Sequence, residues 1–108
     1  MIEVVLTYDL VPNINQDAYL QFLRKAIVLI FHQKGIQEIR AKRSLAGSPQ
    51  VMIVLSWESV ADWNKFESTK DWTILIEEMK KTFVLDMKSQ VWGPSPIAPE
   101  PLKPSKPN

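Results

Sequence analysis

Hydrophobic residues in this chain follow two different periods, and the order in which the periods alternate restricts the possible folds more than any other feature. Segment 2–8, IEVVLTY, alternates at a period of two and is rich in β-branched residues, as strands are. Segments 36–45, 50–57 and 83–92 are predicted strands for the same reasons. Two longer segments, one ending at Lys34 and the other spanning 60–82, repeat apolar residues at helical spacing.

The order of these segments is strand, helix, strand, strand, helix, strand. The turn at 46–49 is short, so the second and third strands are predicted to form an antiparallel hairpin. This order predicts an α+β chain with a ferredoxin-like βαββαβ arrangement, in which one four-stranded antiparallel sheet carries its helices on one face. The strand at 50–57 is apolar on both faces, which predicts a central position covered on two sides.

Short polar residues and a glycine mark the predicted helix ends. Asn13, with Gln16 three residues later, predicts the start of the first helix, and Gly35 predicts its left-handed stop. Ser59, with Asp62 three residues on, predicts the start of the second helical region.

The length of 108 residues fits one small domain, which we place at 1–92. A domain of this size gains stability from a partner. The remaining segment, 93–108, contains six prolines and is predicted to be an extended, proline-rich tail. Such a tail is either disordered or lies along a surface, for example that of a partner subunit.

Charge and residue content exclude several classes of function. Thirteen basic residues nearly balance twelve acidic ones, so neither nucleic acid nor a membrane is an expected partner. The chain has no cysteine and one histidine, which excludes thiolate sites and a multi-histidine metal site within one chain. We expect no metal and no other cofactor. The N-terminus lacks the basic region of a signal peptide, and no apolar run approaches the ~20 residues of a membrane span, so we expect a cytoplasmic protein.

Three of the four tryptophans lie in one stretch, WESVADWNKFESTKDW (57–72). In one straight helix Trp63 and Trp72 would point to opposite sides, so we predict a break near Ser68 and Thr69, where side chains compete for backbone hydrogen bonds. Most of these aromatic side chains are then core residues. The alternative is a pocket for a flat organic ligand beneath the bent helix. Its walls would be Tyr19, Phe22, Trp63, Phe66 and Trp72.

The two faces of the predicted sheet differ in character. The helices are expected to cover the face that bears Val4, Leu6 and Leu55. The opposite face is half apolar, and an exposed apolar face of this kind marks association. Two copies packed back to back across a two-fold axis would cover it, and the alternative is a solvated sheet face. The residues predicted to form this dimer face are Val5, Arg40, Lys42, Met52, Val54, Asp86 and Trp92.

A sequence motif accompanies this element order. The third predicted strand ends in Trp57-Glu58-Ser59, and Trp63, Phe66, Ser68 and Trp72 follow at fixed spacing. Over 2–92 the chain resembles the antibiotic biosynthesis monooxygenase (ABM-like) family of the dimeric α+β barrel superfamily. The resemblance implies a homodimer with back-to-back sheets and a ligand cleft between sheet and helices. Some members of the family oxidise polycyclic aromatic compounds without a prosthetic group, and others degrade haem.

The haem-degrading branch of the family uses an Asn on the first strand and a Trp and a His on the second helical region. Segment 2–8 of this chain has no Asn. Phe66 stands where the Trp would be, and Ile76 stands near the His position. The resemblance therefore does not imply haem degradation.

Two functions stay open, and with them the question of whether the chain is an enzyme. In the first, it is a small-molecule-binding homodimer that acts as a cofactor-independent monooxygenase on an aromatic or polyketide-like compound, which a buried base would ionise. In the second, it is a non-catalytic dimeric scaffold or stress-response interaction protein, and the proline-rich tail is its contact element. The candidate catalytic residues are His32, Tyr8 and Trp63. His32 is equally explained as an exposed histidine near a helix C-terminus.

Overall fold

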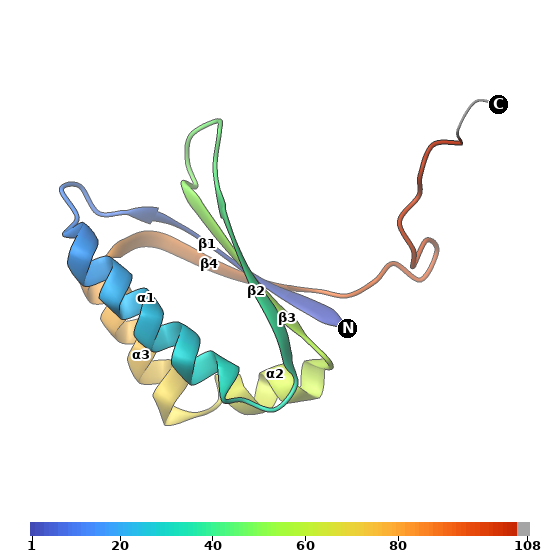
Figure 1. The fold of residues 1–108 in the computed structure, drawn as a ribbon, viewed down its shortest axis with the longest axis horizontal. Coiled ribbons are helices and arrows are strands. Elements are labelled where there is room, and N and C mark those ends of the chain that lie inside the picture. The colour runs from blue at the N-terminus through green and yellow to red at the C-terminus, as the bar shows by residue number, and fades with distance from the viewer. Residues whose placement is uncertain (106–108) are drawn as a thin grey trace.

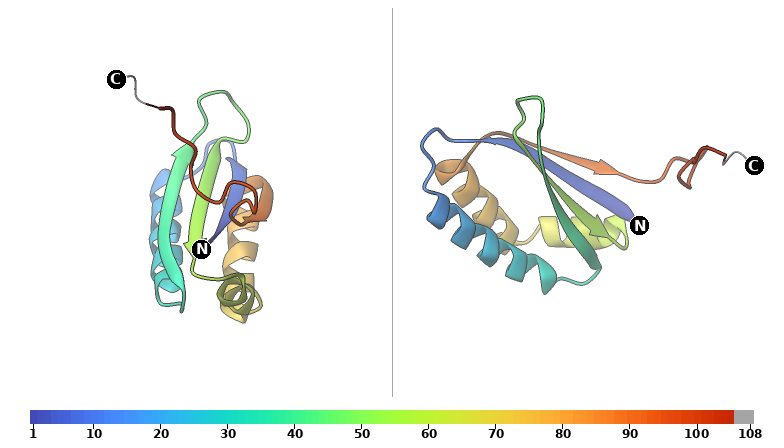
Figure 2. Two further views of the ribbon diagram at one scale, coloured as in Figure 1. Left: turned by 90° about the vertical axis from the view of Figure 1, so that its right-hand side faces the viewer. Right: turned by 45° about the horizontal axis from the view of Figure 1, so that its top comes forward.

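The computed structural model describes residues 1–105 and contains the predicted order of elements (Figure 1). The elements are β1 (Ile2–Leu10), α1 (Gln16–Phe31), β2 (Ile36–Arg43), β3 (Val51–Trp57), α2 (Val60–Glu67), α3 (Lys70–Thr82) and β4 (Val84–Trp92). The strands form one sheet in the order β2-β3-β1-β4, and every neighbouring pair is antiparallel. The helices lie together on one side of this sheet (Figures 1 and 2). The predicted ferredoxin-like α+β fold is confirmed.

The first helix begins and ends at other residues than the sequence predicts. The N-cap of α1 is Asn15, whose side-chain oxygen accepts a hydrogen bond from the backbone N–H of Ala18 at 3.1 Å. The predicted cap, Asn13, instead lies in the preceding turn with a φ of 57°. The helix ends at Phe31, three residues before the predicted end at Lys34. Two asparagines within three residues offer the same capping chemistry, and only the path of the turn selects between them.

Gly35 has the left-handed conformation that the sequence predicts, with a φ of 94°. It also lies against the next helical region, because a Cβ atom at this position would be only 2.4 Å from Oδ2 of Asp62. Asp62 in turn accepts a hydrogen bond from the Ser59 hydroxyl at 3.0 Å, at the predicted N-terminus of α2. The turn after α1 is therefore fitted closely to the start of α2.

The predicted break in the second helical region is confirmed. Ser68 is the C-cap of α2 and Thr69 is the N-cap of α3. The Thr69 hydroxyl accepts from the backbone N–H of Trp72 at 3.3 Å and donates to the carbonyl of Phe66 at 2.7 Å. A side chain thus satisfies backbone groups that an unbroken helix would have paired. Both Trp63 and Trp72 are buried as a result.

The last strand contains an irregularity that the sequence did not predict. In the pairing of β1 with β4, Thr7 faces Lys88 but Asp9 faces Leu85, so β4 has an extra residue there. Asp86 has a φ of 54° at this position, as the extra residue of a β-bulge often does. The bulge shifts the alternation by one residue, and Leu85 lies on the face away from the helices instead of toward them.

The hydrophobic core lies between the sheet and the helices. Val4, Leu6 and Tyr8 of β1 and Leu55 and Trp57 of β3 are buried there, as the alternation predicted. By contrast, residues 93–105 form neither helix nor strand and extend away from the body of the molecule (Figures 1 and 2). Two apolar side chains of this segment, Ile97 and Leu102, are 94% and 87% exposed. Residues 106–108, the end of the predicted tail, lie outside the described residues.

Candidate functional site

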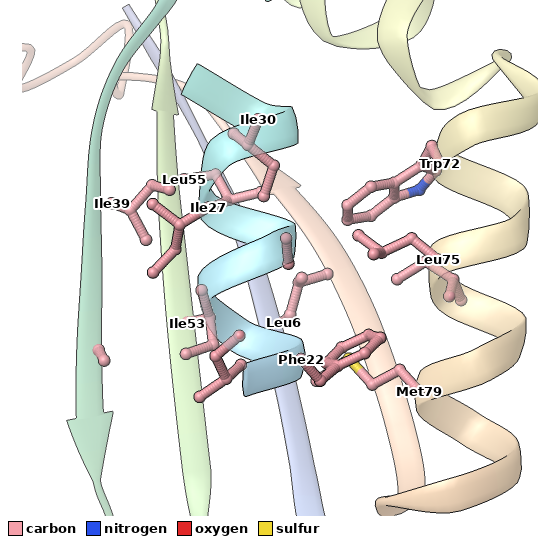
Figure 3. Close-up of a pocket in the computed structure, with 14 residues that line it drawn as sticks. Leu6, Phe22, Ile27, Ile30, Ile39, Ile53, Leu55, Trp72, Leu75 and Met79 are labelled. Carbon is pink, nitrogen blue, oxygen red and sulfur yellow. The ribbon is translucent and has the colours of Figure 1, made fainter. Parts of the chain in front are cut away.

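An apolar cavity of about 120 Å³ lies between the sheet and the pair of long helices (Figure 3). Side chains of α1 and α3 form two of its walls, and side chains of β1, β2 and β3 form its floor. The residues that line it are Leu6, Phe22, Leu23, Ala26, Ile27, Ile30, Ile39, Ala41, Ile53, Leu55, Trp72, Leu75, Ile76 and Met79.

No ionisable side chain lines this cavity in the described part of the chain. Its one side chain with a polar group is that of Trp72, and Figure 3 shows the carbon ring of the indole toward the cavity and the nitrogen nearer to α3. An apolar cavity of roughly 150 Å³ in another protein stays dry and binds benzene. The cavity seen here is therefore suited to a hydrophobic ring or a branched hydrocarbon group.

A second, larger hollow of about 240 Å³ lies on the other side of α3, next to the edge strand β4. It shares Leu6, Trp72 and Ile76 with the apolar cavity, so these three residues border both spaces. Unlike the cavity, it has charged groups. Its lining residues are Leu6, Trp63, Glu67, Trp72, Ile76, Lys80, Met87, Lys88 and Ser89.

The five aromatic residues predicted to form a pocket are distributed over several places. Phe22 and Trp72 line the apolar cavity, whereas Trp63 lines the hollow beside β4. Phe66 lies with Trp63 and Trp72 in the core, and Tyr19 lies beside Phe83 with ring centroids 5.7 Å apart. The sequence reasoning did not single out the aliphatic lining. One feature of the sequence could have indicated this lining: apolar residues cover an unusually wide arc around α1. That arc includes the cavity residues Leu23 and Ile27.

The tryptophan-rich stretch forms one packed aromatic cluster, made of Trp57, Trp63, Phe66 and Trp72. Ring centroids within it lie 5.2 to 6.3 Å apart in tilted or edge-to-face arrangements, the geometry that aromatic pairs prefer. Trp63 is 1% exposed. The indole Nε1 of Trp57 is buried without a hydrogen-bond partner among residues 1–105. Because the four rings are buried and packed against one another, we interpret this cluster as structural core.

Tyr8, a candidate catalytic residue, is fully buried and forms a hydroxyl pair with the partly buried Tyr19. Its oxygen lies 2.6 Å from the hydroxyl oxygen of Tyr19. Burial raises the pKa of Tyr8 far above its ordinary value, and the hydrogen bond to Tyr19 raises it further. Burial also raises the pKa of Tyr19, although the hydrogen bond with Tyr8 lowers it in part. Both phenols are protonated at neutral pH, so they are hydrogen-bond donors rather than bases.

The candidate residue His32 lies outside these cavities. It is the C-cap of α1, it is exposed, and its Nδ1 lies 2.6 Å from the carbonyl oxygen of Val28. This contact is that of a side chain that caps the last carbonyls of a helix. His32 lines neither the apolar cavity nor the hollow beside β4.

The sheet face away from the helices carries the residues predicted for a dimer face. The register places Val5 opposite Val54, Thr7 opposite Met52, and Arg40 opposite Val54. Met52 and Trp92 are 36% and 56% exposed, whereas Val54 is already buried within one subunit. Lys42 pairs with Met52 in the register, and Asp86 lies at the bulge.

A charged pair lies on the same face. Nε of Arg40 is 2.9 Å from Oε2 of Glu38, and this contact lowers the pKa of the Glu38 carboxyl group. Both residues of the pair belong to one strand, β2.

Fold and site together define a ferredoxin-like α+β protein with an apolar cavity between its helices and its sheet. Solved structures with this fold include antibiotic biosynthesis monooxygenases and a Dabb-family protein, members of the dimeric α+β barrel class. No family model and no curated protein matches the sequence.

Three solved structures show how varied this class is. A candidate antibiotic biosynthesis monooxygenase from Deinococcus radiodurans has a TM-score of 0.73 at 17% identity, and the match covers 98% of this chain and 100% of that one. SnoaB, a cofactor-independent oxygenase from Streptomyces nogalater, has a TM-score of 0.71 at 7% identity over 92% and 97% of the two chains. Hydroxynitrile lyase from Passiflora edulis has a TM-score of 0.70 at 11% identity over 84% and 90%. At these identities the likeness establishes the fold and not a reaction.

Within residues 1–105, none of the helices is both long enough and apolar enough to cross a lipid bilayer. Within the same range, no three side chains of the types that ligate metals gather in one place.

Proposed function

We propose that this protein is a small-molecule-binding homodimer with the activity of a cofactor-independent monooxygenase on an aromatic or polyketide-like compound. The observation that carries the proposal is the apolar cavity between α1, α3 and the sheet. The likeness in fold to antibiotic biosynthesis monooxygenases and to SnoaB supports it. A pocket lined by apolar side chains favours a hydrophobic ring over a polar group.

In such a reaction the ionised substrate itself supplies electrons to oxygen, so the protein needs to bind the substrate, orient it and keep water away. The aliphatic walls are suited to these tasks. Tyr8 and Tyr19 do not take the proton, because the pKa of each phenol is raised. The proposal therefore requires a substrate that ionises readily.

Binding is tested by calorimetric titration with a panel of aromatic compounds against the wild type and two matched variants. Ala26→Leu adds a branched side chain to the lining of the cavity, whereas Ala61→Leu makes the same change on an exposed position of α2. We expect Ala26→Leu to weaken binding at least tenfold and Ala61→Leu to leave it unchanged. Oxygen consumption by the ligands that bind, measured with a chelator present, then tests the reaction. Equal binding by both variants would remove the cavity from the proposal.

The dimer is the second part of the proposal, and the sheet face away from the helices is its interface. Met52 and Leu85 add partly exposed apolar area to this face, at 36% and 46% exposure. Met52→Glu places a charge there, and Leu20→Glu places the same charge on the exposed side of α1. Analytical ultracentrifugation should show a dimer for the wild type and Leu20→Glu and a monomer for Met52→Glu. A monomeric wild type would contradict the proposed interface.

One observation favours the alternative function, a non-catalytic dimeric scaffold. Residues 93–105 expose Ile97 and Leu102 almost fully, as a segment that contacts another protein would. If the scaffold function is correct, no compound in the panel binds, and removal of residues 93–108 leaves the dimer intact.

A further inference from the structure

The apolar cavity is closed toward α3 and open toward β2, the edge strand of the sheet. Three of its four lining residues from α3 are buried, namely Trp72, Leu75 and Met79. By contrast, Ile27 of α1 is 38% exposed and Ala41 of β2 is exposed, although both line the cavity. Figure 3 shows the α3 side chains on one side of α1 and the strands β2 and β3 on the other. The cavity therefore has its mouth between α1 and β2, and its inner end lies against α3.

The register of the sheet fixes the direction of the side chains at this mouth. Ala41 faces Ile53 of β3, and Ile53 faces Leu6 of β1. Side chains of residues that face each other across neighbouring strands lie on the same side of a sheet. Since Leu6 is buried in the core beneath the helices, Ala41 also points to the helix side. Lys42, the next residue of β2, points to the opposite side.

We infer that the cavity takes aromatic compounds whose polar groups are at one end only, and that they bind with the apolar end against α3 and the polar end at the mouth, beside Ala41. No ionisable side chain among the described residues lines the cavity, and Figure 3 shows the indole nitrogen of Trp72 nearer to α3 than to the cavity. A hydroxyl or charged group at the inner end would lose its hydrogen bonds with water and find no replacement. At the mouth the same group keeps its contact with water.

The size of the cavity supports the same orientation. Its volume of about 120 Å³ is well below the ~300 Å³ at which pockets for drug-sized compounds begin. A compound of polyketide size therefore enters only in part, and the rest projects through the mouth. Leu20 and Ile27 lie on one face of α1, and both are partly exposed. Apolar surface thus continues along α1 outside the cavity, where the projecting part of a ligand can lie.

The inference rests on the proposed function and deepens it, because it names the class of substrate and its orientation. It also explains how a cavity without a base serves a substrate that must be ionised. Tyr8 and Tyr19 are protonated at neutral pH, and neither of them lines the cavity. A phenol whose hydroxyl is held at the mouth loses its proton directly to water, so its ionisation needs no side chain.

The first test compares 4-propylphenol with 4-(3-hydroxypropyl)phenol by calorimetric titration of the full chain. The two compounds differ only in a hydroxyl group at the far end of the propyl chain. We expect the second compound to bind at least tenfold more weakly, because one of its hydroxyls is buried without a partner whichever end enters first. Equal affinities would overturn the inference and leave the proposed function standing.

The second test places a charge at the mouth and titrates 4-propylbenzoate, whose carboxylate we expect beside Ala41. Ala41→Glu should weaken its binding about threefold and Ala41→Lys should strengthen it about threefold, as partly exposed charge pairs do. Binding of 4-propylphenol, which is neutral at neutral pH, should change in neither variant. Lys42→Gln is the matched control, because it alters the net charge as Ala41→Glu does but on the opposite side of β2.

The outcomes separate the inference from the proposed function. If the Ala41 variants leave the affinity for 4-propylbenzoate unchanged, or change it no more than Lys42→Gln does, the polar end does not lie at this mouth and the inference is overturned. The proposed function then still stands on the binding of the three compounds. Absence of binding by all of them would overturn the inference and the proposed function together.

Discussion

The space between the sheet and the helices is filled differently at its two ends. Beneath α2 and the start of α3, the rings of Trp57, Trp63, Phe66 and Trp72 pack against one another with centroids 5.2 to 6.3 Å apart. Beneath the middle of α1, aliphatic side chains surround the cavity of about 120 Å³ (Figure 3). Both regions rest on the same strand, β3, which carries Trp57 at one end and Ile53 near its middle.

The two ends of this space differ in the role we expect for each: the aromatic end stabilises the fold, and the aliphatic end has room for a ligand. Large rigid rings fill space with few conformations and bury much apolar area each, so the aromatic cluster is the stable part of the core. Branched aliphatic side chains that project from α1 and the sheet do not meet closely, and they leave a cavity that a ligand can use. The stretch with most of the tryptophans therefore supports the fold, and the cavity proposed as the binding site lies beside it.

The largest effect is expected when the aromatic cluster is opened. Trp63→Ala removes a ring that is 1% exposed and contacts three other rings, and we expect a loss of about 3–5 kcal/mol in the free energy of unfolding. Ile27→Ala, at the partly exposed rim of the cavity, should cost roughly 1 kcal/mol or less. Denaturant titrations of both variants measure the contrast. Similar losses would show that the two ends are packed alike.

Added volume should act in opposite directions at the two ends. Phe66→Trp enlarges a side chain in the packed cluster, and we expect it to destabilise the protein by about 1–3 kcal/mol. Ala26→Leu fills part of the cavity, and we expect a stabilisation of about 0.5–2 kcal/mol. Thermal unfolding followed by circular dichroism reports both. Destabilisation by Ala26→Leu would mean that the cavity does not accept a side chain.

The Tyr8–Tyr19 pair adds a polar contact to the comparison between the aromatic and the aliphatic end of the core. It holds the start of α1 to β1. Tyr19→Phe leaves the fully buried hydroxyl of Tyr8 without a partner, and we expect a cost of about 1–3 kcal/mol. Tyr8→Phe leaves the hydroxyl of Tyr19, which is only half buried, free to bind water, and should cost about 0.5–1.5 kcal/mol. Chemical denaturation of the two variants tests this order. The reverse order would show that water reaches Tyr8.

The smallest effect is expected in the dependence of stability on pH. The pKa of Tyr8 is raised in the folded state above its ordinary value of 10.0. The unfolded chain therefore loses this proton first, and the stability that the pair contributes is present below pH 10 and declines as the pH rises above it. Urea midpoints should be flat between pH 7 and 9 and fall above 10. In Tyr8→Phe the decline should be shallower, and an equal decline would assign it to other groups.

The fold could be predicted from the sequence because its signals are local. The period of two in β1, the helical stripe of Trp72, Leu75 and Met79, and the polar pair Ser68 and Thr69 each specify structure within a few residues. These signals gave the element order and the break between α2 and α3. The face of the sheet that the helices cover followed from the same alternation.

The cavity and the bulge could not be predicted in this way, because each depends on how distant segments meet. The shift at Asp86 becomes visible only when β4 is paired with β1, and it moves Leu85 to the opposite face. The cavity depends on the distance between α1 and the sheet and on the volumes of facing side chains such as Ala26 and Ala41. Aromatic residues are the conspicuous signal of a pocket in a sequence, and here aliphatic ones form most of its lining.

The bulge in β4 has a consequence for how copies of this protein avoid harmful contacts. β4 and β2 are the outer strands of the sheet, and each offers unpaired backbone groups onto which a foreign strand can add. The kink at Asp86 interrupts that row on β4, and the run Arg40, Lys42 and Arg43 places positive charge along β2. Such borders resist the open-ended lateral stacking that leads to fibrils. The dimer proposed above uses the face of the sheet away from the helices instead, and association through that face would close after two copies.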